Sequence, residues 1–500
     1  MSEDILAKIV RMRREDIERL GLNFGIEIPE KRRRGHIEFL GTPGAILEVK
    51  RASPSKGDIA PDLDPVGLAA TYADANAQAV SVLTEGNFFK GSLRDLIAVA
   101  DSMEERSRRG LHACAVLRKD FLLFEDEIDI AYRCGADAVL LIARILDDEQ
   151  LVKMAKRAQS FDMQAFVEVR EVDDLRKLKV VTEALGDAAA KTIVAGVNSR
   201  DLATFHTDPL VPAGIRNKLP AKAVFESGIH TPADAAYARS LGFTGILVGE
   251  AVAKNPPLAR EVAFSFGSSC VNARGNFWKK IAELRDTKPL VEGNGMRRPL
   301  VKICGITRME DGLCAVEAGA DLLGFVFSNT KRLTTEKFVR EMSAALPSPK
   351  PLLVGVITDP ESEEGRTAIK LAHEGILDAV QFHGVEPGDA GCAYYCAARV
   401  GEPEDFERVI ALRRNGEPRI LLDAKVEGIP GGTGKTIPES LLREKAGDLP
   451  LWLAGGINPE NVSAICEKFH PELIDVSSGV EDAPGIKNPE KIRKLFEKVL

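Results

Sequence analysis

The chain lacks long apolar runs and an excess of charge of either sign. Its longest apolar stretches have the length of β-strands, well short of the roughly 20 residues that a membrane span needs, and no signal-peptide core lies near the N-terminus. The 67 Lys and Arg residues face 75 Asp and Glu residues, a net charge of -8. This balance indicates neither a surface for nucleic acid nor a basic face for membranes, although small anionic ligands stay possible. We therefore expect a cytoplasmic protein that acts on small molecules.

Metal-binding patterns are also missing. The eight cysteines include no Cys-x-x-Cys pair, as expected of reduced thiols in a cytosolic protein. The seven histidines show no His-Glu-x-x-His spacing. We therefore expect no metal site.

Strand-like segments dominate what is present. With 500 residues, 44% of them hydrophobic, the chain is too long for one compact domain. Apolar, β-branched stretches predict strands near 45–51, 78–84, 112–119, 137–143, 163–169, 192–198, 222–227 and 245–249. Eight strands separated by helix-length intervals over about 260 residues are typical of one (β/α)8 barrel. A second series predicts strands near 300–304, 322–327, 352–357, 378–383, 396–400, 419–423, 451–455 and 473–477, with the weakest pattern at 396–400.

These two series predict the domain organisation. We expect an α/β protein of two tandem (β/α)8 TIM barrels, over residues 1–262 and 299–500, joined by a linker over 263–298 that is rich in Ser, Gly, Asn and charged residues. An extra N-terminal helix is predicted on the first barrel, because apolar residues there follow a 3.6-residue period. These residues are Ile5, Ile9, Met12, Ile17 and Leu20. A short helix around Trp278–Arg285 is expected to dock against one of the barrels.

Ionisable and polar side chains close the strands of the first series. They are Glu48 with Lys50, Lys119, Glu168, Asn198 with Arg200, and Glu226 with Ser227. Because the carboxyl ends of barrel strands meet at one mouth, these lysines and glutamates can shift each other's pKa and serve as acid and base. A single strand-end Lys or Glu is more often half of a solvated salt bridge. Five strands that end in this way favour an active site.

These residues resemble the indole-3-glycerol phosphate synthase family. The matching strings are Glu48-x-Lys50-Arg51-x-Ser53-Pro54-Ser55, Ser81-Val82-Leu83-Thr84-Glu85, Lys119-Asp120-Phe121, Val167-Glu168-Val169, Val197-Asn198-x-Arg200-Asp201-Leu202 and Glu226-Ser227-Gly228-Ile229. The resemblance implies conversion of a carboxyphenylamino-deoxyribulose phosphate to indole-3-glycerol phosphate, by ring closure, loss of carbon dioxide and dehydration. It makes Lys119 the general acid for ring closure. Lys50 would hold the substrate carboxylate and exchange protons with Glu48, while Glu168 would stabilise cationic intermediates or move protons.

The same resemblance assigns further residues to the substrate. Asn198 and Ser227 would orient it, and its phosphate would bind Ser53 and the loops after the seventh and eighth strands. The remaining residues expected to bind substrate or phosphate are Arg51, Arg200, Glu226, Gly228 and Gly249. One departure stands out, because some relatives carry a small hydroxyl residue where this chain has Glu250. Its carboxylate would repel phosphate unless it points away.

The second series carries a different set of residues at its strand ends. Cys304 ends the first strand, Arg332 follows the second, His383 ends the fourth and Asp423 ends the sixth. A thiolate and a carboxylic acid on opposed strands can move a proton between adjacent carbons of a sugar. Cysteine suits the base role when cationic groups or helix dipoles lower its pKa, whereas a lone cysteine here is more often a small buried hydrophobe. The expected phosphate position holds Gly455, Gly456, Ser477 and Ser478.

A glycine-rich string in this half looks at first like a nucleotide-binding loop. It runs Gly432-Thr433-Gly434-Lys435-Thr436. The Walker pattern needs a glycine five residues before Gly434, where this chain has Ile429, and no marked strand leads into the string. An anion-contacting loop over the barrel mouth fits better than a nucleotide site.

This half resembles the phosphoribosylanthranilate isomerase family. The strings are Lys302-Ile303-Cys304-Gly305-Ile306-Thr307, Gly324-Phe325-Val326-Phe327, Gln381-Phe382-His383-Gly384, Gly431-Gly432-Thr433-Gly434-Lys435-Thr436 and Asp475-Val476-Ser477-Ser478-Gly479-Val480-Glu481. The resemblance implies an Amadori rearrangement that opens a ribose ring and yields an aminoketose. It makes Cys304 the general base and Asp423 the general acid, with Arg332 on the anthranilate. Many relatives have Ser-Pro or Ser-Lys where this chain has Thr330-Lys331.

The product implied for the second barrel is the substrate implied for the first. The sequence therefore predicts a bifunctional enzyme of tryptophan biosynthesis, an isomerase and a decarboxylating carbon–carbon lyase, in which the C-terminal barrel acts first. Its substrates would be small phosphorylated aminosugars. No cofactor is expected, because acids, bases and a phosphate site suffice, and an internal barrel–barrel interface favours a monomer.

Two alternatives stay open. One is a related phosphate-binding barrel that acts on aminosugars of histidine biosynthesis. Cys304 argues against it, since those enzymes use paired aspartates for the same rearrangement. The other is a phosphate-ligand-binding or assembly module with one barrel inactive, which would lack acid–base residues.

Overall fold

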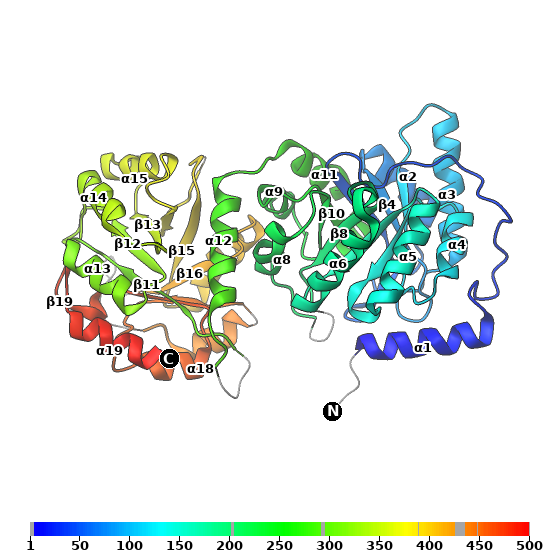
Figure 1. Ribbon diagram of the computed structural model, residues 1–500. Helices are drawn as coiled ribbons and strands as arrows, with labels where there is room; N and C mark the ends of the chain where they lie inside the picture. The colour runs from blue at the N-terminus through cyan, green and yellow to red at the C-terminus, as the bar shows by residue number, and fades with distance from the viewer. Residues whose placement is uncertain are drawn as a thin grey trace. The chain divides into compact units, whose positions relative to one another are not determined.

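The protein folds as two units, each built around a closed barrel of parallel strands (Figure 1). The computed structural model describes residues 5–201, 205–291, 296–388, 390–425, 436–447 and 449–499. The units span Met1–Val271 and Asn272–Leu500. In the described part of the chain, none of the helices combines the length and the apolar character that crossing a membrane would require.

The first barrel follows the predicted strands closely. Its strands are β1 Gly44–Val49, β4 Ala79–Leu83, β5 Ala115–Lys119, β6 Ala138–Ile142, β7 Gln164–Val169, β8 Ile193–Asn198, β9 Ala223–Glu226 and β10 Gly245–Val248. The barrel closes because β1 pairs in parallel with both β4 and β10. Nearly every strand residue is buried, as expected where helices cover the outside and side chains fill the inside.

Helices and one short hairpin connect these strands. They are α1 Ile5–Leu20, β2 Ala52–Ser53, β3 Gly57–Asp58, α2 Pro65–Asp74, α3 Leu93–Arg108, α4 Asp126–Arg133, α5 Asp148–Ser160, α6 Val172–Leu185, α7 Ala189–Thr192, α8 Leu210–Ile215, α9 Pro232–Ser240, α10 Glu250–Lys254 and α11 Leu258–Ser268. Side-chain caps set several helix starts: Asp64 accepts from two backbone N–H groups of α2, and Ser92, Asp147 and Thr231 begin α3, α5 and α9 in the same way.

The second barrel also confirms the predicted fold. Its strands are β11 Leu300–Cys304, β12 Leu322–Val326, β13 Leu352–Ile357, β14 Ala379–His383, β15 Tyr394–Val400, β16 Ile420–Ala424, β17 Trp452–Ala454 and β18 Leu473–Val476. It closes through the pairs β11–β12 and β11–β18. The segment with the weakest pattern forms β15, which begins at Tyr394 and not at the expected residue 396.

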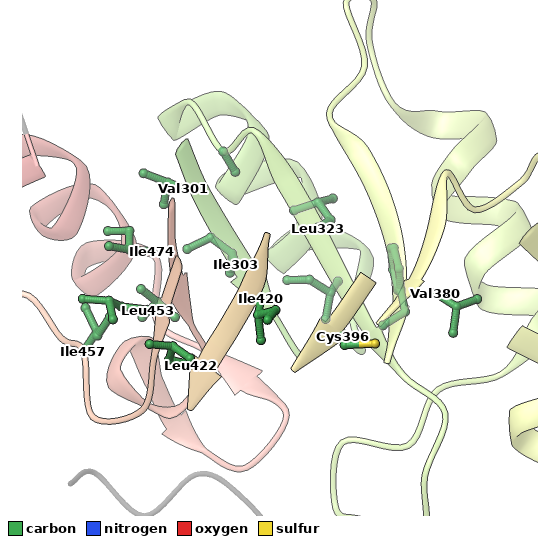
Figure 2. Close-up of a cluster of buried hydrophobic side chains, with 14 of the residues drawn as sticks. Val301, Ile303, Leu323, Val380, Cys396, Ile420, Leu422, Leu453, Ile457 and Ile474 are labelled. Atoms are coloured by element: carbon green, nitrogen blue, oxygen red, sulfur yellow. The ribbon is translucent and has the colours of Figure 1, made fainter. Parts of the chain in front are cut away.

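The strands of this barrel separate an apolar face from a reactive one. Val301 and Ile303 belong to the apolar cluster drawn in Figure 2. The alternate residues Lys302 and Cys304 project to the other face, because successive side chains of a strand point to opposite sides. The surrounding elements are α13 Met309–Ala318, α14 Glu336–Ala345, α15 Glu363–His373, α16 Phe406–Arg414, α17 Glu439–Leu441, α18 Val462–Phe469, the hairpin of β19 Glu481–Ala483 with β20 Ile486–Lys487, and α19 Pro489–Val499.

Aromatic side chains close each barrel at the end where its strands begin. In the first unit Phe39 is fully buried, with its ring 5.6 Å from that of Phe166 in β7. In the second unit helix α12, Ala273–Thr287, serves this purpose (Figure 1). Its Phe277 ring stacks 5.9 Å from Tyr395, and its Trp278 ring lies 5.7 Å from Trp452. Residues 263–298, expected to form a linker, thus include the end of α11 and all of α12.

The N-terminal helix buries a charged residue that periodicity did not indicate. α1 buries Leu6, Ile9 and Arg13, while Leu20, which the apolar pattern includes, is exposed. The guanidinium of Arg13 lies 2.9 Å from Asp120 and 2.6 Å from Glu127. A buried arginine is stable where paired carboxylates replace water, so these ion pairs select the inner face of α1.

Candidate active sites

The mouth of the first barrel holds a cavity of about 140 Å³. All the residues of this half expected to be catalytic line it: Glu48, Lys50, Lys119, Glu168, Asn198 and Ser227. The expected binding residues Ser53, Arg200, Glu226, Gly228 and Gly249 also line it. They come from the carboxyl ends of strands β1, β5, β7, β8, β9 and β10 and the loops that follow. The structure therefore brings together residues about 200 positions apart in the chain.

Arg51 is not brought to this cavity, although it was expected to bind substrate. Its guanidinium lies 2.7 Å from one carboxylate oxygen of Asp95 in α3 and 3.1 Å from the other. It also donates to the backbone oxygen of Lys90. Neighbouring side chains on an extended segment point in opposite directions, so Lys50 faces the cavity and Arg51 fastens the segment to α3.

Lys119 lies among carboxylates. Its ammonium is 3.5 Å from Glu226 and 3.7 Å from Glu168. Burial alone would lower the pKa of Lys119, but the carboxylates of Glu226, Glu168 and Glu48 raise it above its usual value. Burial and the charge of Glu168 raise the pKa of Glu226 above that of an ordinary carboxyl group. Lys119 is therefore an ammonium at neutral pH and can donate a proton.

Two glycines of the barrel wall make room for these carboxylates. A Cβ atom at Gly196 would lie 2.2 Å from Oε1 of Glu226 and 2.6 Å from the Phe166 ring. A Cβ atom at Gly249 would lie 2.5 Å from Oε1 of Glu48. These distances are shorter than any van der Waals contact, so the arrangement of the carboxylates requires glycine at both positions.

An aromatic residue that the sequence did not single out completes this site. Lys50 lies 3.3 Å from Glu48 and has its ammonium 5.3 Å from the centre of the Phe89 ring. The carboxylate of Glu85 accepts hydrogen bonds from the backbone N–H groups of three residues, Phe89 among them. Glu85 thus shapes the loop that presents Phe89. The apolar residues Ile5, Leu6 and Ile9 of α1 also line the cavity, which the periodicity of α1 could not reveal.

Glu250, the departure noted in the sequence, has a partner on its own helix. Its carboxylate accepts a hydrogen bond of 2.7 Å from the ammonium of Lys254. Although burial would raise the pKa of Glu250, the hydrogen bond from Lys254 and the charges of Lys56 and Arg200 lower it. The carboxylate is therefore ionised and compensated by cations.

The mouth of the second barrel holds a cavity of about 280 Å³. Its lining includes the expected residues Cys304, Arg332, His383, Asp423, Gly455, Gly456, Ser477 and Ser478. Gly432, expected to contact phosphate, lies outside the described residues, as does most of its glycine-rich string. Cys304 and Asp423 thus line one cavity from β11 and β16.

The thiol of Cys304 is buried among cations. Burial raises the pKa of the Cys304 thiol, and the positive charges of Lys302, Lys487 and Arg332 oppose that rise. Its sulfur packs against Gly324, where a Cβ atom would lie 2.6 Å from Sγ. The cations expected to support a thiolate are present, but burial outweighs them in the resting site.

A hairpin after the last strand holds Arg332. Nε and Nη2 of Arg332 donate to the carboxylate of Glu481 over 2.9 Å and 2.7 Å. The buried Lys487 donates to the same carboxylate over 2.8 Å and to the backbone oxygen of Ser477. Glu481 stood in a matching string without a role, and Lys487 was missed because it lies beyond the strand-end pattern. Over the ranges that the structure describes, there is also no group of three or more His, Cys, Asp or Glu side chains placed to hold a metal ion.

Comparisons with known proteins match the two barrels to two different families. Residues 7–263 match the family model described as indole-3-glycerol phosphate synthase, and residues 301–498 match that of N-(5'-phosphoribosyl)anthranilate (PRA) isomerase. A multifunctional tryptophan biosynthesis protein of Schizosaccharomyces pombe is 32% identical over 491 residues, which cover 91% of this chain and 59% of that protein. This chain therefore spans less than two thirds of the length of that relative.

Two other relatives match this chain over most of their own length. A tryptophan biosynthesis protein of Phytophthora nicotianae is 31% identical over 497 residues and 87% of each chain. The indole-3-glycerol phosphate synthase of a Roseiflexus species is 38% identical over 284 residues, 53% of this chain and all of that protein. The chain thus belongs to the indole-3-glycerol phosphate synthase family in its first barrel and to the N-(5'-phosphoribosyl)anthranilate isomerase family in its second.

Proposed function

We propose that the two barrels catalyse consecutive steps of tryptophan biosynthesis. The second barrel converts N-(5-phosphoribosyl)anthranilate to 1-(2-carboxyphenylamino)-1-deoxyribulose 5-phosphate. The first barrel converts this product to indole-3-glycerol phosphate, with loss of carbon dioxide and water. The observation that carries the proposal is that the acid–base residues of both family patterns line cavities at the carboxyl ends of their strands. A barrel retained only as a binding or assembly module would not need them.

In the second barrel, Asp423 donates a proton to the ribose ring oxygen, and the ring opens to an iminium ion. The Cys304 thiolate removes the proton from the adjacent C2. A proton added at C1 and one lost from the C2 hydroxyl then give the aminoketose. The support is that both side chains line one cavity, with Arg332 held beside Cys304 by Glu481.

In the first barrel, the ammonium of Lys119 protonates the ketone oxygen while the aromatic carbon attacks the carbonyl carbon. Its raised pKa keeps Lys119 protonated for this step. Carbon dioxide then leaves and the benzene ring is restored. The hydroxyl group formed from the ketone oxygen next departs as water, with a proton from the adjacent CH2, to give the indole. Lys50 holds the substrate carboxylate and exchanges protons with Glu48, and Glu168 stabilises the cationic intermediates; these three side chains line the same cavity as Lys119.

A two-step fluorescence assay tests the proposal. Freshly made phosphoribosylanthranilate is added to the purified chain, with and without a chelator, while loss of its emission and formation of indole-3-glycerol phosphate are followed together. We expect both signals to change, with the chelator without effect. If the emission of phosphoribosylanthranilate is lost but no indole-3-glycerol phosphate forms, the role of the first barrel is contradicted. If neither signal changes, both roles are contradicted.

We also infer that the protein is a cytoplasmic monomer that acts on small phosphorylated aminosugars. The eight cysteines are all free thiols, which suits a reducing compartment. Each cavity is lined by residues of a single unit, so no second chain is required to complete it. Light scattering during size-exclusion chromatography should give a mass near 54.2 kDa, whereas twice that mass would contradict the monomer.

A further inference from the structure

A buried lysine lies beneath the cavity of the second barrel. The ammonium of Lys302, on β11, is fully buried and lies 2.7 Å from Oδ2 of Asp475. It also donates to Oε1 of Gln381 over 2.6 Å. An ammonium group can only donate hydrogen bonds, so the atom of Gln381 that faces Lys302 must be its oxygen.

The orientation of the Gln381 amide follows from these partners. Its oxygen also accepts a hydrogen bond of 2.8 Å from the hydroxyl of Tyr395. The NH2 group must then occupy the other side, 3.3 Å from Nδ1 of His383. A turned amide would direct its NH2 group at the ammonium of Lys302, placing two donors against each other in a buried site.

The amide in turn determines where His383 carries its proton. Because Gln381 donates to Nδ1, that nitrogen is an acceptor and the ring proton lies on Nε2. Nε2 is 3.3 Å from Oδ2 of Asp423. The other charged or titratable residues on the described lining of this cavity are Cys304, Arg332, Arg399 and Asp475. Among them Arg399 adjoins Asp423 on the neighbouring strand β15.

The neutral ring orients the acid. With Nε2–H directed at Oδ2 of Asp423, the acidic proton is left to Oδ1. That oxygen lies toward Gly455, where a Cβ atom would be only 2.9 Å away, and Gly455 lines the cavity. If Gln381 were turned, His383 would carry its proton on Nδ1 and would leave Oδ2 without its donor.

We propose that Lys302 and Gln381 are positioning residues that hold His383 as the neutral Nε2–H tautomer and so place the acidic proton of Asp423 on Oδ1. This inference rests on the proposed isomerase function for its catalytic meaning. The tautomer itself is a property of the resting protein and is measurable whether or not the substrate is turned over.

Nitrogen NMR of the full chain with 15N-labelled histidine tests the tautomer. The signals of His383 are assigned by their loss in His383→Asn. We expect Nε2 to be protonated and Nδ1 bare at neutral pH. A protonated Nδ1 in the unmodified protein would overturn the proposal. Absence of isomerase activity together with a bare Nδ1 would instead contradict the proposed function and leave the tautomer assignment supported.

Variants test the cause. In Gln381→Glu, a carboxylate replaces the donor, so a proton should move to Nδ1 of His383, and kcat of the isomerase should fall at least about tenfold with a smaller change in KM. Lys302→Met should allow the amide to turn and give the same change. Tyr395→Phe is the matched control, because it removes the other donor to Oε1 but keeps Lys302. An unchanged tautomer in both Gln381→Glu and Lys302→Met, or a switched tautomer in Tyr395→Phe, would overturn the proposal.

Discussion

In the first barrel the expected proton donor, Lys119, lies within 3.5 Å and 3.7 Å of two carboxylates that line the same cavity. In the second barrel the lysines whose charges act on the Cys304 thiol are buried and form ion pairs with other residues, Lys302 with Asp475 and Lys487 with Glu481. The first site thus shifts the pKa of Lys119 through carboxylates that line the same cavity. In the second site, the lysine charges that oppose the rise in the pKa of the Cys304 thiol belong to ion pairs beneath and beside the cavity. Two barrels of one fold can therefore reach acid–base chemistry by different electrostatic routes.

The largest effect is expected when the proposed acid of one barrel is removed and the activities of both barrels are measured. Lys119→Ala removes the proposed acid of the first barrel, and Asp423→Asn that of the second. We expect each substitution to lower its own activity by about 10²- to 10⁴-fold and to leave the other activity unchanged. Separate assays of the two half-reactions measure this, and each variant serves as the control for the other. Equal loss of both activities in either variant would contradict two independent sites.

A smaller loss of activity is expected when a glycine of the barrel wall beside a reactive group is replaced by alanine. Gly196→Ala places a methyl group against Glu226, and Gly324→Ala places one against Cys304. A shift of the reactive group by about 1 Å can lower a rate by about 10²-fold, so each variant should impair only its own half-reaction. Gly267→Ala in α11 is the control, because nothing lies within 4 Å of its added Cβ. Full activity in Gly196→Ala would show that Glu226 can move without consequence.

The pH dependence should differ between the two barrels. Cys304 is the proposed thiolate base, and burial raises its pKa, so the thiolate fraction, and with it isomerase kcat/KM, should increase as the pH rises toward that pKa. Lys119 acts as an ammonium, and its raised pKa keeps it protonated over the same range. Synthase activity should therefore show no alkaline loss from Lys119 between about pH 7 and 9. Parallel profiles for the two half-reactions would contradict the different electrostatic routes.

The smallest effect is expected at the hairpin of the second barrel. Glu481→Gln weakens the hydrogen bonds that hold Arg332, so KM for phosphoribosylanthranilate should rise up to about tenfold while kcat changes less. Asp482→Asn is the matched control, because that neighbouring carboxylate is exposed and pairs with Lys491. Steady-state kinetics distinguishes them; a similar KM in both variants would argue against the role of Glu481.

Much of this architecture could be predicted because parallel strands buried on both faces appear as short apolar runs. The start of β15 was missed because the strand begins with Tyr394 and Tyr395, which do not belong to the run of small apolar residues that follows them. The site residues at the strand ends could also be predicted from the sequence, because a (β/α)8 fold brings the carboxyl ends of its strands together at one mouth.

The remaining features depend on partners distant in sequence. Arg51 follows Lys50 directly, and only the position of Asp95 on α3 shows that its guanidinium is engaged away from the cavity. Arg13 is polar in any periodic analysis, yet it is buried because Asp120 and Glu127 meet it. The support of Arg332 by Glu481 likewise requires the hairpin to fold back on the barrel. Pairing of this kind is a property of three-dimensional proximity, which spacing along the chain does not encode.

Helix α12 has a consequence for dividing the gene. Its Phe277 and Trp278 close the second barrel, although the helix precedes β11, the first strand of that barrel, by more than ten residues. A truncated product that begins at β11 would expose Tyr395 and Trp452 to water and tend to aggregate. A division between Val271 and Asn272 would instead give each half its own aromatic closure. A boundary between the two coding segments that keeps both barrels closed therefore lies before α12, well ahead of the first strand of the second barrel.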